Sequence, residues 1–173
     1  MVQTLEYDQL EWSIADSQIE GAALDRALNA AIADADISQS LEAYLEIVDR
    51  FYAGDVKVTT DWPGEPVTGK ARLRSLLLNF LIPLHVLAEV GGLSVSVRYQ
   101  SIPTDIRDSA LSAWQVRLTG VTGSSCVVTW RALRKWHGST VTEEHHYDRH
   151  VEGGPLGIDD LDFGVLKLTK EEY

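Results

Sequence analysis

Apolar and polar positions follow two different periods along the chain, and the change divides it into two parts. Up to about residue 90, apolar residues recur every three or four positions, which is typical of helices that bury one face. This spacing predicts a first helix over 22–35, a second helix that ends at Phe51 and Tyr52, and a third over 69–82. Because proline cannot donate a backbone hydrogen bond, the third helix is expected to end near Pro83.

After residues 91–92 the pattern alternates, as in strands with one buried face. Four runs follow, at 93–102, 109–119, 125–136 and 140–151. Short glycine-containing connections join the later runs, which favours antiparallel neighbours in a meander. A shorter strand over 56–60 is expected before them, after a turn at 53–55. Helices first and a long sheet afterwards predict an α+β fold in which a curved antiparallel sheet wraps around the N-terminal helices.

Charge and cysteine content narrow the classes of partner. The 173 residues include 26 acidic and 15 basic side chains, a formal net charge of −11. Such a field repels phosphate backbones and anionic lipids, so neither nucleic acid nor a membrane is an expected partner. Residues 2–20 show neither a basic stretch nor a continuous apolar run, so a cytoplasmic location is expected. The single cysteine, Cys126, cannot form an internal disulfide.

Two local patterns resemble the nuclear transport factor 2-like superfamily, in its SnoaL-like branch: FYAGDVKVTTDWPG at 51–64 and RKWHGSTVTEEHHYDRH at 134–150. The resemblance covers 36–150. It implies a cone-shaped, cystatin-like α+β barrel with a pocket between helices and sheet, and a homodimer. The superfamily includes isomerases, dehydratases, polyketide cyclases and non-catalytic members. The chain then divides into an N-terminal helical extension (1–35), the barrel domain (36–151) and a C-terminal tail (152–173).

The last predicted strand holds most of the titratable side chains, and strand geometry sorts them into two faces. One face carries Val141, Glu143, His145 and Tyr147. Its apolar and aromatic members predict that it points into the cone, where His145 can shuttle a proton and Tyr147 can donate to an oxyanion. Asp61, at a strand end, is the candidate general base. The alternative is that Asp61 accepts turn hydrogen bonds while the other two side chains fill the pocket wall.

The opposite face carries Thr142, Glu144, His146, Asp148 and His150. Histidine and carboxylate ligands at alternating positions are the chemistry of a zinc or non-haem iron site. Side chains on one face of a strand are about 7 Å apart, however, so a straight strand does not converge four of them. The prediction is therefore a solvated polar face with no metal. No phosphate-cradling glycine pattern is present either, and no cofactor is expected.

The candidate ligand-binding residues are mostly aromatic: Tyr44, Trp62, His85, Trp114 and Trp130. The two later tryptophans share the inward phase of their strands, although such side chains are more often core than ligand contacts. The basic residues at 131, 134 and 135 are expected to pair with surface acids. The functional prediction is a protein that binds a small apolar oxygenated molecule and transfers protons, as an isomerase, cyclase or dehydratase. The alternative is a non-catalytic module for ligand binding or protein association.

Overall fold

The computed structural model describes residues 21–106, 108–154 and 156. The first helix is described over 21–34. The further elements are α2 (Glu42–Phe51), β1 (Tyr52–Thr60), β2 (Val67–Thr68), α3 (Lys70–Glu89), β3 (Leu93–Ile102), β4 (Ser109–Gly120), β5 (Ser125–His137) and β6 (Thr140–Glu152). The first 20 residues of the predicted extension and most of the predicted tail lie outside the described residues.

The strands form one sheet in the order β2-β1-β6-β5-β4-β3. Strands β3 to β6 are an antiparallel meander, as predicted, and their bounds differ from the predicted runs by at most one residue. β1 joins the sheet beside β6 in a parallel pairing, with Val58 opposite Glu144. The sheet is curved but not closed, so β2 and β3 are its edges.

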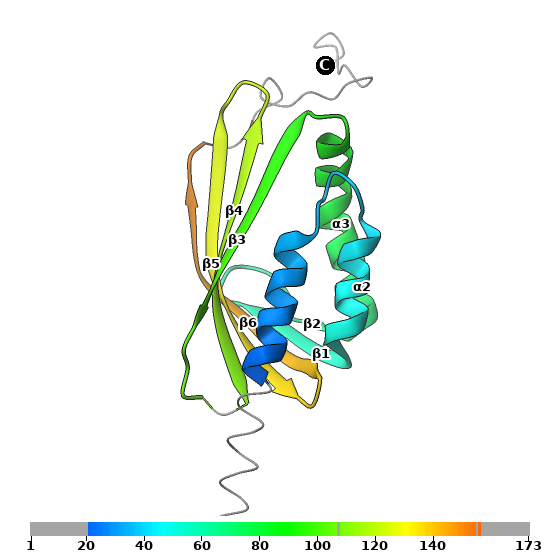
Figure 1. Cartoon of the computed structure of the whole chain (residues 1–173), viewed down its shortest axis with the longest axis vertical. Helices are drawn as coiled ribbons and strands as arrows, with labels where there is room; N and C mark the ends of the chain where they lie inside the picture. Colours follow the sequence, from blue (N-terminus) through cyan, green and yellow to red (C-terminus); the bar gives the residue numbers. More distant parts are fainter. Residues whose placement is uncertain (1–20, 107, 155, 157–173) are drawn as a thin grey trace, which may run out of the picture.

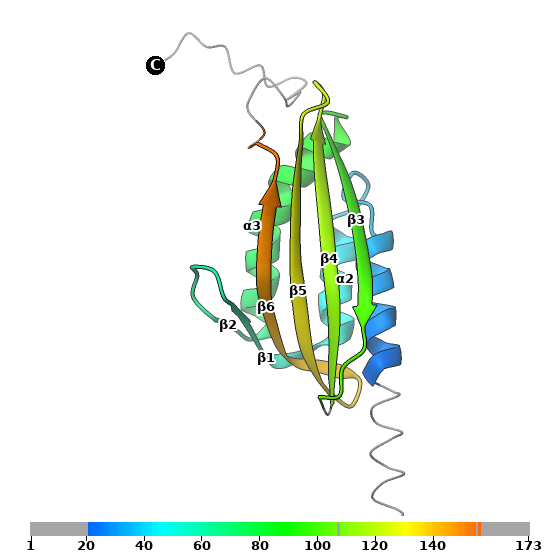
Figure 2. The ribbon, with the colours of Figure 1, turned by 90° about the vertical axis from the view of Figure 1, so that its left-hand side faces the viewer.

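All three helices lie against the same face of the sheet (Figure 1), whereas Figure 2 shows the other face without a covering element among the described residues. The predicted α+β fold is confirmed. Helix 21–34 packs into the same core as the sheet, because Leu28 is fully buried against it. The core has two clusters: one around Phe51, Val56 and Leu73, and one around Ile37, Leu81 and Ala88. Leu77 packs against both.

The predicted helix end at Pro83 is wrong, since α3 continues through this residue to Glu89. An interior proline costs about 3 kcal/mol. Packing of Leu81 and Ala88 against Ile37 offsets this cost by holding the last two turns on the core. The helix ends where Gly91 adopts a φ of 75°, a left-handed value that favours glycine.

The predicted turn at 53–55 is also wrong. Tyr52 directly follows α2 and is already the first residue of β1. The register between β1 and β6 shifts between Tyr52 and Lys57, so the segment forms an irregular stretch of strand.

By length and composition, α3 is the one described helix that could span a membrane, which is weak grounds for a membrane role. Several apolar side chains of α3 are exposed: Leu76, Phe80, Ile82 and Val86. The homodimer, the cytoplasmic location and the expected absence of a membrane partner stay predictions.

Candidate functional site

A cavity of about 240 Å³ lies between the helices and the inner face of the sheet. Its walls are mainly apolar, with aliphatic side chains from all three helices and aromatic side chains from β4 and β5. Five lining residues have a hydroxyl, imidazole or charged group: Tyr44, Tyr52, Arg134, Glu144 and His146. We call this the inner cavity. Few polar groups in an apolar pocket are the usual composition of a small-molecule site.

The Arg134 guanidinium is buried and is held by side chains from three parts of the fold. Its Nε donates to Glu144 Oε1 at 3.1 Å, and its Nη1 donates to Asn29 Oδ1 at 2.7 Å. Nη1 also lies 3.2 Å from Asp25 Oδ1. Ser112 Oγ is 3.4 Å from the same nitrogen. One buried cation thus joins helix 21–34 to β4, β5 and β6, and its two carboxylate partners offset the cost of burying its charge.

Glu144 is the centre of the polar end of the cavity. Tyr52 donates its hydroxyl hydrogen to Glu144 Oε2 at 2.6 Å, and His146 Nε2 lies 2.7 Å from Oε1. Burial alone would raise the pKa of the Glu144 carboxyl, but Arg134 and then His146 outweigh burial and hold this pKa well below its usual range. Burial, reinforced by the Glu144 charge, raises the pKa of Tyr52 well above its usual range. Glu144 is therefore a carboxylate and Tyr52 a phenol at neutral pH.

The ionised Glu144 fixes the tautomer of His146. A carboxylate only accepts hydrogen bonds, so Nε2 carries the hydrogen and Nδ1 of a neutral ring carries the lone pair. Nδ1 has no hydrogen bond to a described residue. The His146 side chain is 25% exposed, against 4% for Glu144. Its ring stacks on Trp62 at 5.9 Å between centroids and lies 6.4 Å from Trp130. A base oriented by a buried carboxylate therefore lies on the cavity wall.

Solved structures with the same arrangement of elements include three of different assigned activity. A protein from Mesorhizobium loti named as a SnoaL-like polyketide cyclase is 16% identical with a TM-score of 0.51, over 73% of this chain and 97% of that chain. An LEH-like epoxide hydrolase from M. tuberculosis is 14% identical with a TM-score of 0.51, over 75% and 82%. A protein named as an isomerase from Bacillus subtilis is 12% identical with a TM-score of 0.52, over 76% and 88%.

The chain has the nuclear transport factor 2-like fold. The resemblance found in the sequence is thereby confirmed at the level of the fold. No protein-family model and no curated protein matches the sequence. At these identities the fold alone follows from the comparisons, so the activity must be argued from the site.

The sequence predicted that one face of β6 points into the cone. In this nuclear transport factor 2-like sheet the prediction holds for Val141 and is wrong for the residues after it. Val141 is buried as predicted, but the pairing of β5 with β6 shifts at this point, from Trp136 opposite Val141 to Lys135 opposite Glu143. An extra residue in a strand inverts the alternation of the residues that follow. Glu144 and His146 therefore lie at the inner cavity, whereas Glu143 is exposed and pairs with Lys135.

The three predicted catalytic residues lie together, but away from the inner cavity. His145 Nε2 is 3.0 Å from Asp61 Oδ1, and the His145 ring stacks on Tyr147 at 5.8 Å. Thr59 Oγ1 is 2.7 Å from Nδ1 of the same histidine. The side chains of His145 and Asp61 are 39% and 64% exposed. The prediction that this face points into the cone is wrong, and a catalytic role of these residues stays a prediction.

The predicted ligand-binding residues divide into two groups. Trp114, Trp130 and Tyr44 line the inner cavity. Trp114 donates from Nε1 to Ser112 Oγ at 2.8 Å, and it stacks on Trp130 at 6.1 Å. Trp62 and His85 are not among the lining residues. Trp62 reaches the site only through its contact with His146, as described above, and His85 contacts the carbonyl oxygen of Ile37.

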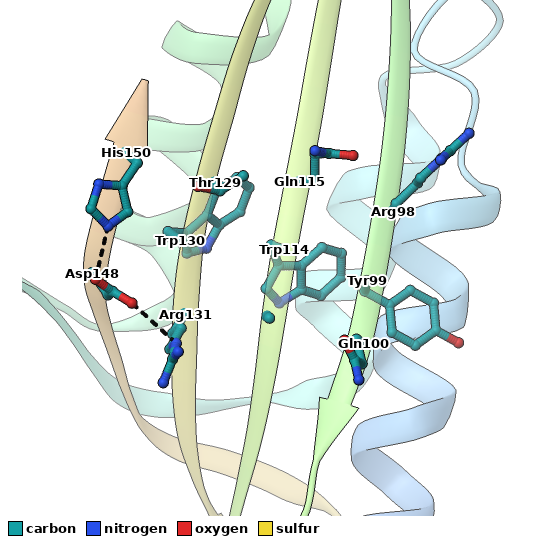
Figure 3. Close-up of a pocket in the computed structure, with 11 residues that line it drawn as sticks. Arg98, Tyr99, Gln100, Trp114, Gln115, Thr129, Trp130, Arg131, Asp148 and His150 are labelled. Carbon is teal, nitrogen blue, oxygen red and sulfur yellow. Dashed lines mark hydrogen bonds and ion pairs between the residues drawn. The ribbon is translucent and has the colours of Figure 1, made fainter. Parts of the chain in front are cut away.

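The outer face of the sheet has a groove of about 450 Å³ over β3, β4, β5 and β6 (Figure 3). We call it the outer groove. At one side Asp148 Oδ2 is 3.1 Å from Arg131 Nε, and Oδ1 is 3.0 Å from His150 Nε2. Asp148 has a φ of 56°, and the pairing of β5 with β6 shifts again between Thr129 and Arg131. The polar residues of the predicted second face are therefore divided between the two faces of the sheet. No group of three or more possible metal ligands occurs among the described residues.

The buried network is the functional feature that sequence reasoning missed, although one signal pointed to it. Val128, Trp130 and Ala132 share the inward phase of β5, and Arg134 is the next position of the same series. The expectation that basic residues pair with surface acids holds for Arg131 and Lys135 but is wrong for Arg134. A charged residue at an inward position predicts buried partners of opposite charge.

Proposed function

We propose that this chain catalyses cofactor-independent proton transfer next to a carbonyl group of a small apolar molecule bound in the inner cavity. The observation that carries the proposal is the 2.7 Å contact of His146 with the buried Glu144 on the wall of a mainly apolar cavity. A base held in one tautomer by a carboxylate is the arrangement that general base catalysis requires. The activities assigned to the structural neighbours, cyclase and isomerase among them, are compatible with this chemistry.

In the proposed reaction His146 Nδ1 takes a proton from the carbon next to the carbonyl. The electron pair of that C–H bond forms the enolate double bond, and the carbonyl π electrons move to oxygen. Glu144 stabilises the imidazolium that results, because the carboxylate is already ionised. His146 then returns the proton to another carbon, which completes an isomerisation without any net oxidation or reduction.

Arg134 is the proposed partner of the enolate oxygen. Its Nε and Nη1 are engaged by Glu144, Asp25 and Asn29, and the guanidinium also interacts with Tyr52. Arg134 lines the inner cavity. A fixed cation in a site shielded from water stabilises a developing oxyanion strongly, because no reorganisation is needed.

The test is exchange of carbon-bound hydrogen for deuterium, which requires no knowledge of the natural substrate. A panel of ketones is incubated with the protein in deuterium oxide and followed by NMR. Wild-type protein is expected to accelerate exchange next to the carbonyl, and His146→Ala to lower that rate by about 10²- to 10⁴-fold. His150→Ala, at the outer groove, is the matched control and should exchange at the wild-type rate. Ketone binding without exchange in the wild type would favour the non-catalytic ligand-binding alternative.

A further inference from the structure

Helix α3 is apolar on its outward side as well as on the side that packs on the core. Nine large apolar side chains of the described residues are exposed, and five of them belong to α3 or to the residue that follows it: Leu76, Phe80, Ile82, Val86 and Val90. Single exposed apolar side chains are normal, but a concentration of them on one helix marks an interaction surface. We call these five side chains the α3 face.

The charges of α3 are confined to its two ends and have opposite signs. The residues from Ser75 to Ala88 include no Lys, Arg, Asp or Glu, and this uncharged stretch of 14 residues is about 21 Å long. Basic residues precede it, and Glu89 follows it. Two copies of α3 in antiparallel orientation therefore place the uncharged stretches against each other and the basic end of each helix beside the acidic end of the other.

Arg72 and Glu89 are the residues at these ends that are available for such a contact. Arg72 forms an exposed pair with Glu65 at 3.3 Å, and Glu89 lies 3.8 Å from Nε2 of His85. Exposed pairs of this kind contribute little to stability, so they exchange readily for other partners.

The other surfaces that could cover or replace the α3 face fit less well. The outer groove is lined mainly by polar or charged side chains, among them Arg98, Gln115 and Thr129, which are costly to desolvate. The chain leaves β6 at the end of the sheet where β3 begins, directly after α3. A C-terminal tail that folded back from there would bring the aspartates at 159, 160 and 162 to the acidic end of α3.

From these features we infer that the α3 face is a homodimer interface, in which the α3 helices of two copies pack antiparallel about a two-fold axis near the middle of the uncharged stretch. Such a contact is isologous, so Arg72 of each copy pairs with Glu89 of the other. Phe80 lies near this axis, and it lines the inner cavity although the residue is 66% exposed. The same contact therefore shields this side of the cavity from water. The inference does not depend on the proposed reaction.

The first test is sedimentation velocity of the full chain over a series of concentrations, where the wild type is expected to form dimers. Leu76→Glu places an unpaired charge of each copy in the interface and should raise the dissociation constant by at least about 100-fold. Val121→Glu is the matched control, because Val121 in the turn before β5 is 54% exposed and Leu76 is 53% exposed. A wild-type monomer at every concentration would overturn the inference. So would a dimer that Thr129→Glu, in the outer groove, disrupts and Leu76→Glu does not.

The second test uses charge reversal at the two ends of α3. Arg72→Glu and Glu89→Arg each bring like charges together at both ends of the interface, and each should weaken the dimer about tenfold. An equal mixture of the two variants should recover the wild-type affinity, because every contact in the mixed dimer again joins opposite charges. Both side chains are exposed, so this test decides the question if Leu76→Glu does not fold. A mixture no tighter than the separate variants contradicts the antiparallel arrangement.

Two further measurements separate this inference from its alternatives. A wild-type monomer that sediments with phosphatidylcholine vesicles would assign the α3 face to a lipid surface and overturn the homodimer. His146→Ala removes the proposed base without touching the α3 face, so it should form dimers as the wild type does. Loss of deuterium exchange and loss of the dimer are therefore distinguishable.

Discussion

Strand β6 carries a carboxylate–imidazole pair on each face of the sheet, and the two pairs differ in their surroundings. Glu144 and His146 are 2.7 Å apart at the inner cavity, with Arg134 and Tyr52 as further donors. Asp148 and His150 are 3.0 Å apart at the outer groove (Figure 3), where their side chains are 44% and 69% exposed. The same residue types therefore serve different purposes. Burial and the number of donors fix the charge of a carboxylate, whereas an exposed pair exchanges its partners with water.

The largest expected effect concerns the two arginines of β5. Arg134→Leu leaves Asp25 and Glu144 buried without their cation, and the free energy of unfolding should fall by about 3–5 kcal/mol. Arg131→Leu, at the outer groove, should cost less than about 1 kcal/mol. Chemical denaturation of both variants measures the difference. Equal losses would show that the two faces of the sheet are not energetically distinct.

Acid unfolding should separate the two carboxylates of the comparison. The folded-state pKa of Glu144 is lowered, so its contribution to stability is present above the unfolded value of 4.5 and is lost as pH falls below it. Glu144→Gln should lower the free energy of unfolding by about 3 kcal/mol at neutral pH. Below about pH 4.5 the free energy of unfolding of this variant should fall less steeply with pH than that of the wild type. Asp148→Asn, which removes a carboxylate of the outer groove, is the control. Denaturation from pH 3 to 7 tests both expectations.

Alkaline unfolding should separate Tyr52, at the inner cavity, from Tyr147 on the outer face. The folded-state pKa of Tyr52 is raised, so its contribution is present below the unfolded value of 10.0 and is lost as pH rises through and beyond it. Tyr52→Phe should lose about 1.5–3 kcal/mol at neutral pH, the worth of a hydrogen bond to a charged group. Above about pH 10 the difference in free energy of unfolding between this variant and the wild type should become smaller. Tyr147→Phe on the outer face is the control. A difference between Tyr52→Phe and the wild type that does not change with pH would contradict the raised pKa of Tyr52.

The smallest expected effect is at the irregular position of β6. Asp148 has a φ of 56°, a conformation that Asn also tolerates and that Ala does not. Asp148→Asn should therefore change the free energy of unfolding by less than about 0.5 kcal/mol. Asp148→Ala should cost about 1 kcal/mol through the backbone alone. Thermal unfolding measures both changes, and the reverse order would show that the backbone conformation at this position does not set the cost.

The sequence predicted the strands well because alternation is a local property. The four runs after residue 92 match β3 to β6 closely, and the glycine connections predicted their antiparallel order. The same alternation failed to predict which side chains of β6 face the cavity. Both register shifts lie opposite β5, and a shift depends on how two strands pair, which a single strand does not encode.

The candidate site was predicted only in part for a similar reason. The place of Trp114, Trp130 and Tyr44 on the cavity wall could be predicted, because their positions in the strands and the helix face inward. Glu144 and His146 were assigned to the solvated face, because an uninterrupted strand was assumed. Pro83 shows the same limit in a helix, since its local preference to end α3 is overcome by tertiary packing.

The buried contacts of Arg134 join residues that are far apart along the chain. Asp25 precedes Arg134 by 109 residues, and Tyr52 precedes Glu144 by 92. During synthesis on a ribosome, helix 21–34 and β1 emerge long before their charged partners exist. Asp25 and Tyr52 remain hydrated until the last two long strands arrive, and closing such long loops is slow. Assembly of the polar end of the cavity is thus a late folding event, completed only when β6 inserts between β1 and β5.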